Sequence, residues 1–90
     1  MPGDREQLRS ELRAFIVTNF MLNEEMRRFT DRDSFLKKGV IDSMGVMELL
    51  AFVQRSYKIR VEPAEAIPQN FDSLEHLADF ILKKMGSVVP

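Results

Sequence analysis

The chain has no cysteine, no tryptophan, one tyrosine and one histidine among its 90 residues. The lack of cysteine excludes disulfide scaffolds, thiolate metal sites and a cysteine nucleophile, so any thiol chemistry has to come from a bound group. A single histidine, His76, argues against a histidine metal cluster and against a Ser-His-Asp triad. We expect His76 to lie on the surface, because Glu75 and Asp79 mark a polar helix face.

Long apolar runs and a strong net charge are missing as well. No segment approaches the roughly 20 apolar residues of a membrane span, and charges at positions 4–6 interrupt the start, where a secretion signal needs an apolar region. The formal net charge is −1, and Arg27-Arg28 with Lys37-Lys38 make only a small basic patch, which disfavours nucleic-acid binding. We therefore expect a soluble, cytoplasmic, monomeric domain over residues 1–90, with a core of about residues 4–86 and a tail at 87–90.

Hydrophobic spacing predicts three long helices and one short helix. The long helices span about residues 4–21, 43–57 and 73–85, and the short one begins near Pro63. Each long helix carries apolar residues at helical spacing, which marks the face that we expect to be buried. These residues are Leu8, Leu12, Phe15, Ile16 and Phe20, then Val46, Leu49, Leu50, Val53 and Tyr57, and finally Leu74, Leu77, Ala78, Ile81, Leu82 and Met85. The sequence thus predicts an all-α, four-helix bundle with a core shared by the long helices.

A long connection separates the first two long helices. Residues 23–42 show no sustained period, and structureless loops of this length are uncommon in compact domains unless they are functional or disordered. We expect its hydrophobic residues to pin the loop to the core: Met26, Phe29, Phe35 and Leu36.

The last part of the chain has clear helix signals. Pro63 and Pro68 bracket a segment that is long enough for one helical turn. Asp72 is expected to cap the last helix, because its spacing to Glu75 has the form of a capping box. Gly86 is expected to end that helix.

Ser43 lies where the polar connection meets the second long helix. The first N–H groups of a helix have no internal partners and the helix dipole is positive there, so an anionic group on this side chain would be stabilised. The alternative is that Asp42 and Ser43 only cap the helix.

The residues around Ser43 carry a wider pattern. A glycine turn and an apolar pair, Gly39-Val40-Ile41, precede Asp42-Ser43-Met44, and further matches occur at Glu48-Leu49, Tyr57–Val61, Asn70–Leu74 and Ala78–Ile81. In these features the stretch from Phe35 to Ile81 resembles the acyl carrier protein family, whose attachment signature is Asp-Ser-Leu. The resemblance implies a four-helix acyl-carrier-like bundle in which Ser43 carries 4′-phosphopantetheine, transferred from coenzyme A by a phosphopantetheinyl transferase. The thiol of this arm would hold an acyl or aminoacyl group as a thioester.

The chain departs from fatty-acid carriers at three positions. Met44 replaces the usual leucine, Gly45 stands where those carriers usually have an acidic residue, and Arg55 replaces an acid. We expect Gly45 to loosen the first turn, because glycine destabilises a helix by about 1 kcal/mol relative to alanine. Together with the weak net charge, these changes favour a dedicated carrier of a fatty-acid-like, polyketide, nonribosomal or other specialised pathway.

One face of the second long helix is more apolar than solvent exposure requires. Opposite the buried stripe lie Met44, Met47, Glu48, Ala51 and Arg55, and apolar side chains rimmed by charge often mark a protein-binding surface. The alternative is that the long connection buries both methionines. The resemblance implies that Asp42 helps the transferase to recognise the site and that Met44, Met47 and Glu48 contact partners. These would be the transferase, an acyl- or aminoacyl-activating ligase or transferase that loads the thiol, and downstream biosynthetic enzymes.

Two function classes remain open. We expect carriage without catalysis, because no base adjoins Ser43 in the sequence and the reactivity would belong to the cofactor. The rival is an unmodified helical interaction module that docks through the face containing Met44 and Met47.

Overall fold

The computed structural model describes residues 5–20 and 22–86 and confirms the all-α fold class. Five α-helices and two 3₁₀ turns follow one another, and this part of the chain contains no strand. The long helices are α1 (Arg5–Asn19), α3 (Ser43–Tyr57) and α5 (Leu74–Lys84). The expected first-helix boundaries at Asp4 and Met21, and the expected tail at 87–90, lie outside the described residues.

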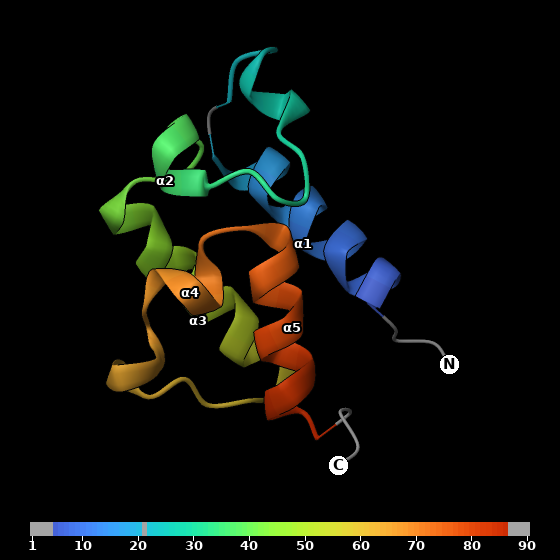
Figure 1. Cartoon of the computed structure of the whole chain (residues 1–90), viewed down its shortest axis with the longest axis vertical. Coiled ribbons are helices and arrows are strands. Elements are labelled where there is room, and N and C mark those ends of the chain that lie inside the picture. The colour runs from blue at the N-terminus through green and yellow to red at the C-terminus, as the bar shows by residue number, and fades with distance from the viewer. Residues whose placement is uncertain (1–4, 21, 87–90) are drawn as a thin grey trace.

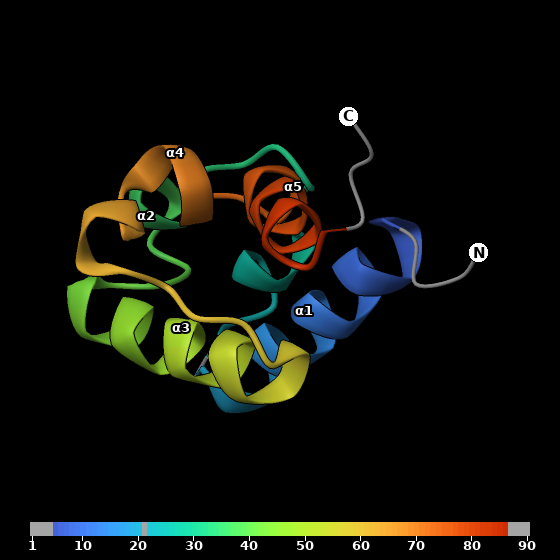
Figure 2. The same ribbon diagram turned by 90° about the horizontal axis from the view of Figure 1, so that it is seen from below.

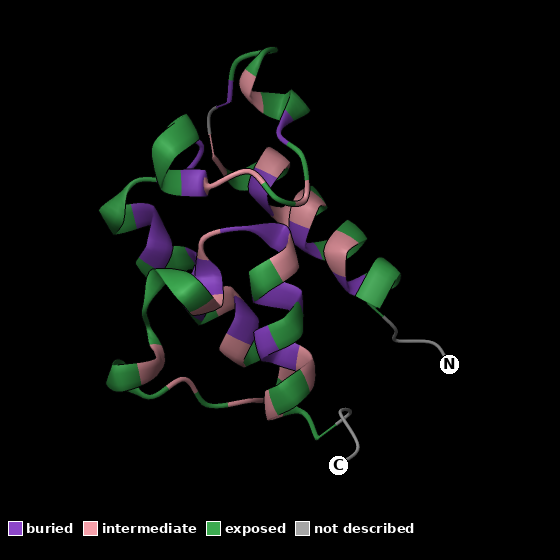
Figure 3. Ribbon diagram, viewed as in Figure 1, coloured by how far each residue is buried: buried purple, intermediate pink, exposed green. Residues whose placement is uncertain are grey.

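The three long helices share one hydrophobic core, as predicted. α5 packs against α1 and against the short helix α4 (Pro68–Phe71), while α3 covers the remaining side (Figures 1 and 2). Figure 3 shows the buried positions facing inward between these helices. The innermost side chains are fully buried: Leu12, Ile16, Leu49, Val53, Leu74, Leu77, Ala78 and Ile81.

The buried stripe of α5 differs from the predicted one at two residues. Met85 is 47% exposed, and it is the C-cap of α5, which ends at Lys84. Phe80, which the stripe omitted, is only 7% exposed, and the Lys84 ammonium lies 5.9 Å from its ring centroid. The helical spacing therefore misassigned one residue at the end of the stripe and missed one buried residue within the helix.

The connection between α1 and α3 contains two short elements that the sequence pattern did not predict. These are a 3₁₀ turn at Met26–Arg28 and the one-turn helix α2 (Phe35–Lys38), both too short to show a period. The connection is pinned to the core as expected, since Phe29 and Phe35 are buried and stack edge to face. Leu36 is the exception at 40% exposed.

Charged groups fasten the same connection to two helices. The Asp31 carboxylate pairs with Arg9 at 2.9 Å and with Arg13 at 3.4 Å on α1, and the Asp31 carbonyl accepts the Glu75 N–H at 2.9 Å. The Arg13 guanidinium also lies 4.3 Å from the centroid of the Phe29 ring. The connection is thus a strap between α1 and the start of α5.

The segment between α3 and α5 forms two turns where one was predicted. A 3₁₀ turn spans Pro63–Glu65, as expected near Pro63. Pro68, however, begins α4, because proline suits the first helical position, where its missing N–H costs no hydrogen bond. Phe71 of α4 is buried in the core. Within the described residues, no helix combines the length and apolar character needed to cross a membrane.

Candidate functional site

Ser43 is the first residue of α3, and its neighbour Asp42 is the cap. The Asp42 Oδ1 accepts the Gly45 N–H at 2.7 Å, and the Asp42 carbonyl accepts the Val46 N–H at 3.0 Å. The Ser43 side chain is exposed, and its hydroxyl makes no hydrogen bond with any residue that the structure describes. Asp42 alone therefore stabilises the helix start, and the Ser43 Oγ is left free to react.

The residues before Asp42 hold this helix start in place. Gly39 ends α2 in the left-handed region at a φ of 73°. Val40 and Ile41 are then buried, and both N–H groups point to the Phe35 carbonyl, at 2.9 and 3.4 Å. The apolar pair that precedes the serine is thus an anchor, after which the chain turns outward.

Gly45 is tightly packed, so the expectation of a loose first turn is wrong. A Cβ atom at this position would lie 2.8 Å from the Phe20 Cε1 and 2.9 Å from the Ile41 Cγ2, both closer than van der Waals contact permits. The absence of a side chain allows the end of α1 to approach the start of α3. Glycine contributes close packing here, which outweighs its low helix propensity.

The outward face of α3 is open, as the amphipathic pattern predicted. Met44 is 80% exposed and Met47 is 71% exposed. Glu48, Ala51 and Arg55 are exposed beside them. The alternative in which the long connection buries both methionines is therefore wrong.

Two further large apolar side chains are exposed on the short elements. Leu36 on α2 and Ile67, the residue before α4, are each 40% exposed. Both short helices lie near the start of α3 (Figures 1 and 2). Neither residue belongs to a helical stripe, so the sequence held no periodic signal that could have marked it.

A second Asp-Ser-apolar segment, Asp72-Ser73-Leu74, begins α5. Ser73 is 3% exposed, and its Oγ accepts the His76 N–H at 3.0 Å, so Ser73 is the cap of α5. The capping box expected from Asp72 is absent, because the Asp72 carboxylate accepts the Leu36 N–H at 3.0 Å and the Ser34 hydroxyl. Of the two serines in such segments, only Ser43 is accessible.

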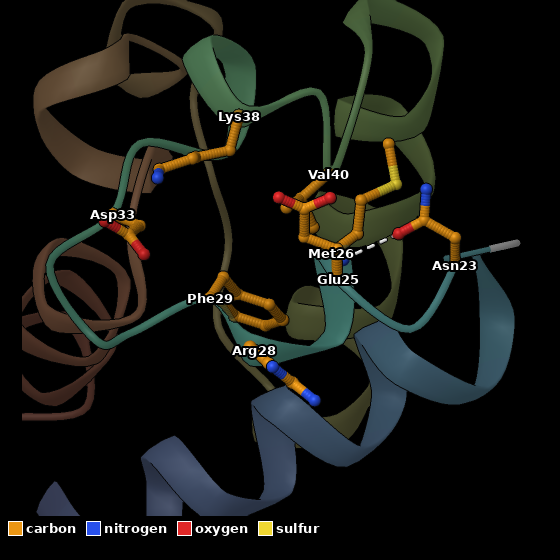
Figure 4. A pocket seen from close by; sticks show the side chains of 8 residues that line it. All are labelled: Asn23, Glu25, Met26, Arg28, Phe29, Asp33, Lys38 and Val40. Carbon is orange, nitrogen blue, oxygen red and sulfur yellow. Dashed lines mark hydrogen bonds between the residues drawn. The ribbon is translucent and has the colours of Figure 1, made fainter.

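A hollow of about 540 Å³ lies beside the anchor, on the side of the strap (Figure 4). The Asp33 carboxylate in its wall accepts the Thr30 N–H at 2.7 Å, and this hydrogen bond lowers the pKa of Asp33 below its ordinary value. The lining mixes acidic, basic and apolar side chains: Asn23, Glu25, Met26, Arg28, Phe29, Asp33, Lys38 and Val40. No single charge dominates, so the hollow does not define a ligand class.

His76, the single histidine of the chain, is exposed on α5, as expected. Over residues 5–20 and 22–86, no group of three or more histidine, aspartate or glutamate side chains could hold a metal ion. Comparison of the chain with protein-family models, curated proteins and solved structures found no match. The described part of the chain is an all-α bundle in which the Ser43 hydroxyl, at the start of α3, is exposed and makes no hydrogen bond with a described residue.

Proposed function

We propose that the protein is an acyl carrier protein that holds an acyl or aminoacyl group as a thioester on 4′-phosphopantetheine attached to Ser43. The observation that carries this proposal is the free, exposed Ser43 hydroxyl at the first position of α3, with the cap supplied by Asp42. A serine needed only for capping would use its oxygen as Ser73 does.

The residues at the start of α3 fit a phosphodiester. The Ser43 and Met44 N–H groups lie in the first turn, where no intrahelical acceptor exists, and the positive end of the helix dipole favours a negative charge on the Ser43 oxygen. Asp42 directs its Oδ1 to the Gly45 N–H, which keeps that oxygen engaged inside the helix start. When attached, the arm supplies the thiol that this cysteine-free chain lacks.

The chain's part in the chemistry is carriage. Attachment joins the Ser43 Oγ to the phosphorus of coenzyme A as the phosphoanhydride bond to 3′,5′-ADP breaks. The serine proton has to pass to a base of the transferase, since no described residue hydrogen-bonds the Ser43 hydroxyl. The bundle then presents the loaded arm to other proteins.

The exposed face of α3 is the proposed contact surface for these partners. Met44, Met47, Glu48, Ala51 and Arg55 extend along the exposed side of α3 from the attachment residue onward, and Asp42 adds a carboxylate at the helix start. The proteins that we expect to bind this face are a phosphopantetheinyl transferase, a ligase or transferase that loads the thiol, and downstream biosynthetic enzymes. Its methionines can adapt to several differently shaped partners.

The test is enzymatic attachment of the arm. Purified protein is incubated with coenzyme A, magnesium and a broad-specificity phosphopantetheinyl transferase, and the intact mass is measured beside Ser43→Ala and Ser73→Ala variants. We expect the parent and Ser73→Ala proteins to gain one phosphopantetheine and the Ser43→Ala protein to gain none. Failure of the parent to gain mass with several transferases would contradict the proposal.

The rival function is an unmodified docking module. It is favoured by the exposure of Met44 and Met47, at 80% and 71%, which suits an apolar partner surface whether or not Ser43 is modified. Such a module would bind its partner equally well as the Ser43→Ala variant. A carrier would lose its thiol-dependent reactions in that variant.

A further inference from the structure

The sulfur atoms of this protein are distributed unevenly. The chain has six methionines and no cysteine, so thioethers are the only sulfur groups in the polypeptide. Met26 is half-buried and Met85 is 47% exposed, whereas Met44 and Met47 are 80% and 71% exposed. The two most exposed of these thioethers therefore lie in the first turns of α3, beside Ser43.

Their position relative to Ser43 is close. Met44 follows the serine directly, and Met47 lies four residues after it, which places it one turn further along the same side of the helix. Both exposed side chains therefore belong to the surface next to the Ser43 hydroxyl, which an attaching enzyme has to reach. A chemical change at either sulfur alters the surface that such an enzyme meets.

Neither methionine supports the fold. The buried part of α3 consists of Gly45, Val46, Leu49, Leu50 and Val53, and both methionines point away from it. Oxidation of a buried methionine disrupts packing, but at these exposed sites the same reaction leaves the core contacts in place. Recognition can therefore change while the bundle stays folded.

We propose that Met44 and Met47 form an oxidation site that controls enzyme access to Ser43. This inference rests on the proposed carrier function. Hydrogen peroxide transfers one oxygen atom to the thioether sulfur, as the O–O bond breaks and an S–O bond forms, and the remaining oxygen leaves as water. The sulfur is oxidised to a sulfoxide and the peroxide is reduced. The product is a polar side chain where the partner would meet an apolar one.

The experiment measures the rate of arm attachment before and after oxidation. The protein without its arm is treated with hydrogen peroxide, so that no prosthetic thiol competes for the oxidant, and peptide mass spectrometry locates the added oxygen. The initial rate of phosphopantetheine attachment is then measured at limiting transferase. We expect oxidation at Met44 and Met47 to lower that rate about tenfold, since two apolar contacts become polar. Methionine sulfoxide reductases should restore it.

The chain offers matched control variants. In Met44→Leu/Met47→Leu protein, all other methionines remain, and its attachment rate, whatever its starting value, should no longer respond to peroxide. A Met85→Leu variant keeps the face and removes an exposed methionine at the far end of α5, so its rate should fall as the parent's does. Thermal unfolding of oxidised and untreated protein should coincide.

The outcomes separate this inference from the proposed function. If the untreated parent gains no arm, the carrier function itself is contradicted. If the parent gains the arm, and protein oxidised at both positions gains it equally fast, the carrier function stands and the oxidation site is rejected. A peroxide effect that persists in the double-leucine variant, or that appears only with loss of folded structure, also overturns the inference.

Discussion

Two helices of this bundle begin with the same kind of segment and use it differently. α3 starts with Asp42-Ser43-Met44 and α5 with Asp72-Ser73-Leu74. In α3 the aspartate is the cap and the serine is the first helical residue, whereas in α5 the helix starts one residue later and the serine is the cap. This shift of one residue leaves Ser43 exposed and Ser73 buried.

The cause of the shift is the tertiary environment of each aspartate. The Asp72 carboxylate binds the Leu36 N–H and the Ser34 hydroxyl, and its carbonyl accepts the Phe35 N–H at 2.9 Å. Asp72 is therefore hydrogen-bonded to the start of α2, and the Ser73 Oγ caps α5 in its place. Asp42 binds the Gly45 N–H of its own helix, so the neighbouring serine is released. The role of each serine follows from what the adjacent aspartate does.

The largest difference between the two segments is expected when each serine hydroxyl is removed, because one variant should lose arm attachment and the other should lose stability. Ser43→Ala should abolish arm attachment and change the free energy of unfolding by less than about 0.5 kcal/mol, because the exposed hydroxyl makes no hydrogen bond with any described residue. The Ser73→Ala protein should still accept the arm fully, but its free energy of unfolding should fall by about 1–2 kcal/mol, because the His76 N–H loses its buried acceptor. Intact mass and urea unfolding report the two effects. A folded Ser73→Ala protein that cannot be loaded would contradict this division.

Removal of each aspartate side chain should again lower the free energy of unfolding more at the start of α5 than at the start of α3. Asp72→Ala should cost about 2–3 kcal/mol, because a charged acceptor that joins α2 to α5 is lost. Asp42→Ala should cost about 1 kcal/mol, the value of a helix cap. Urea unfolding at neutral pH gives both numbers, with Asp72→Asn as a control that keeps one acceptor. Equal losses for the two alanine variants would show that the link from Asp72 to the start of α2 is worth no more than an ordinary helix cap.

Gly45→Ala tests the close approach of α1 at the start of α3. We expect a net loss of about 1–2 kcal/mol from overpacking against Phe20 and Ile41, although alanine is the better helix former. The double variant Gly45→Ala/Phe20→Leu should recover part of that loss by opening space for the methyl group. Urea unfolding of the two variants and of Phe20→Leu alone measures the coupling. An increase in stability by the single change would mean that the first turn tolerates a side chain.

Tyr57, at the C-terminal end of α3, should make the stability of the protein depend on pH in the alkaline range. Burial and the 2.8 Å hydrogen bond to Glu11 raise the pKa of the Tyr57 hydroxyl well above its ordinary value of 10.0. A raised folded-state pKa gives stability that is complete below pH 10 and is lost as pH rises through the folded-state value. The stability advantage of the parent over Tyr57→Phe should therefore shrink above pH 10, as followed by chemical unfolding. A constant difference across this range would contradict the assignment.

The ion pair between Glu65 and Lys84, at the C-terminal end of α5, should make the stability of the protein depend on pH in acid, with a smaller effect. The Glu62 N–H and the Lys84 ammonium, both 2.9 Å from the Glu65 Oε1, hold the pKa of Glu65 below its ordinary value of 4.5. A lowered folded-state pKa gives stability that is present above pH 4.5 and is lost as pH falls through the folded-state value. The difference in free energy of unfolding between the parent and the Glu65→Gln variant, measured by chemical unfolding, should therefore disappear in acid. Parallel pH profiles for the two proteins would exclude this contribution.

Long amphipathic elements were predictable from the sequence. α3 runs from Ser43 to Tyr57 as expected, because apolar residues recur at helical spacing along its fifteen residues, at Val46, Leu49, Leu50 and Val53, and this is a strong local signal. The exposed side of the same helix, with Met44 and Met47, follows from the same period. The short helices α2 and α4, with four residues each, carry too few positions to show a period.

The sequence by itself determined the helical class, the core of the long helices and the position of Ser43 at a helix start, because each depends on near neighbours along the chain. Only the tertiary structure decided which serine is free and why residue 45 is glycine. Ser34 lies 38 residues from Asp72 and removes it from the cap of α5, while Phe20, the residue after α1, occupies the space that a side chain at residue 45 would need. Such contacts join residues that are distant along the chain, so no local pattern can specify them.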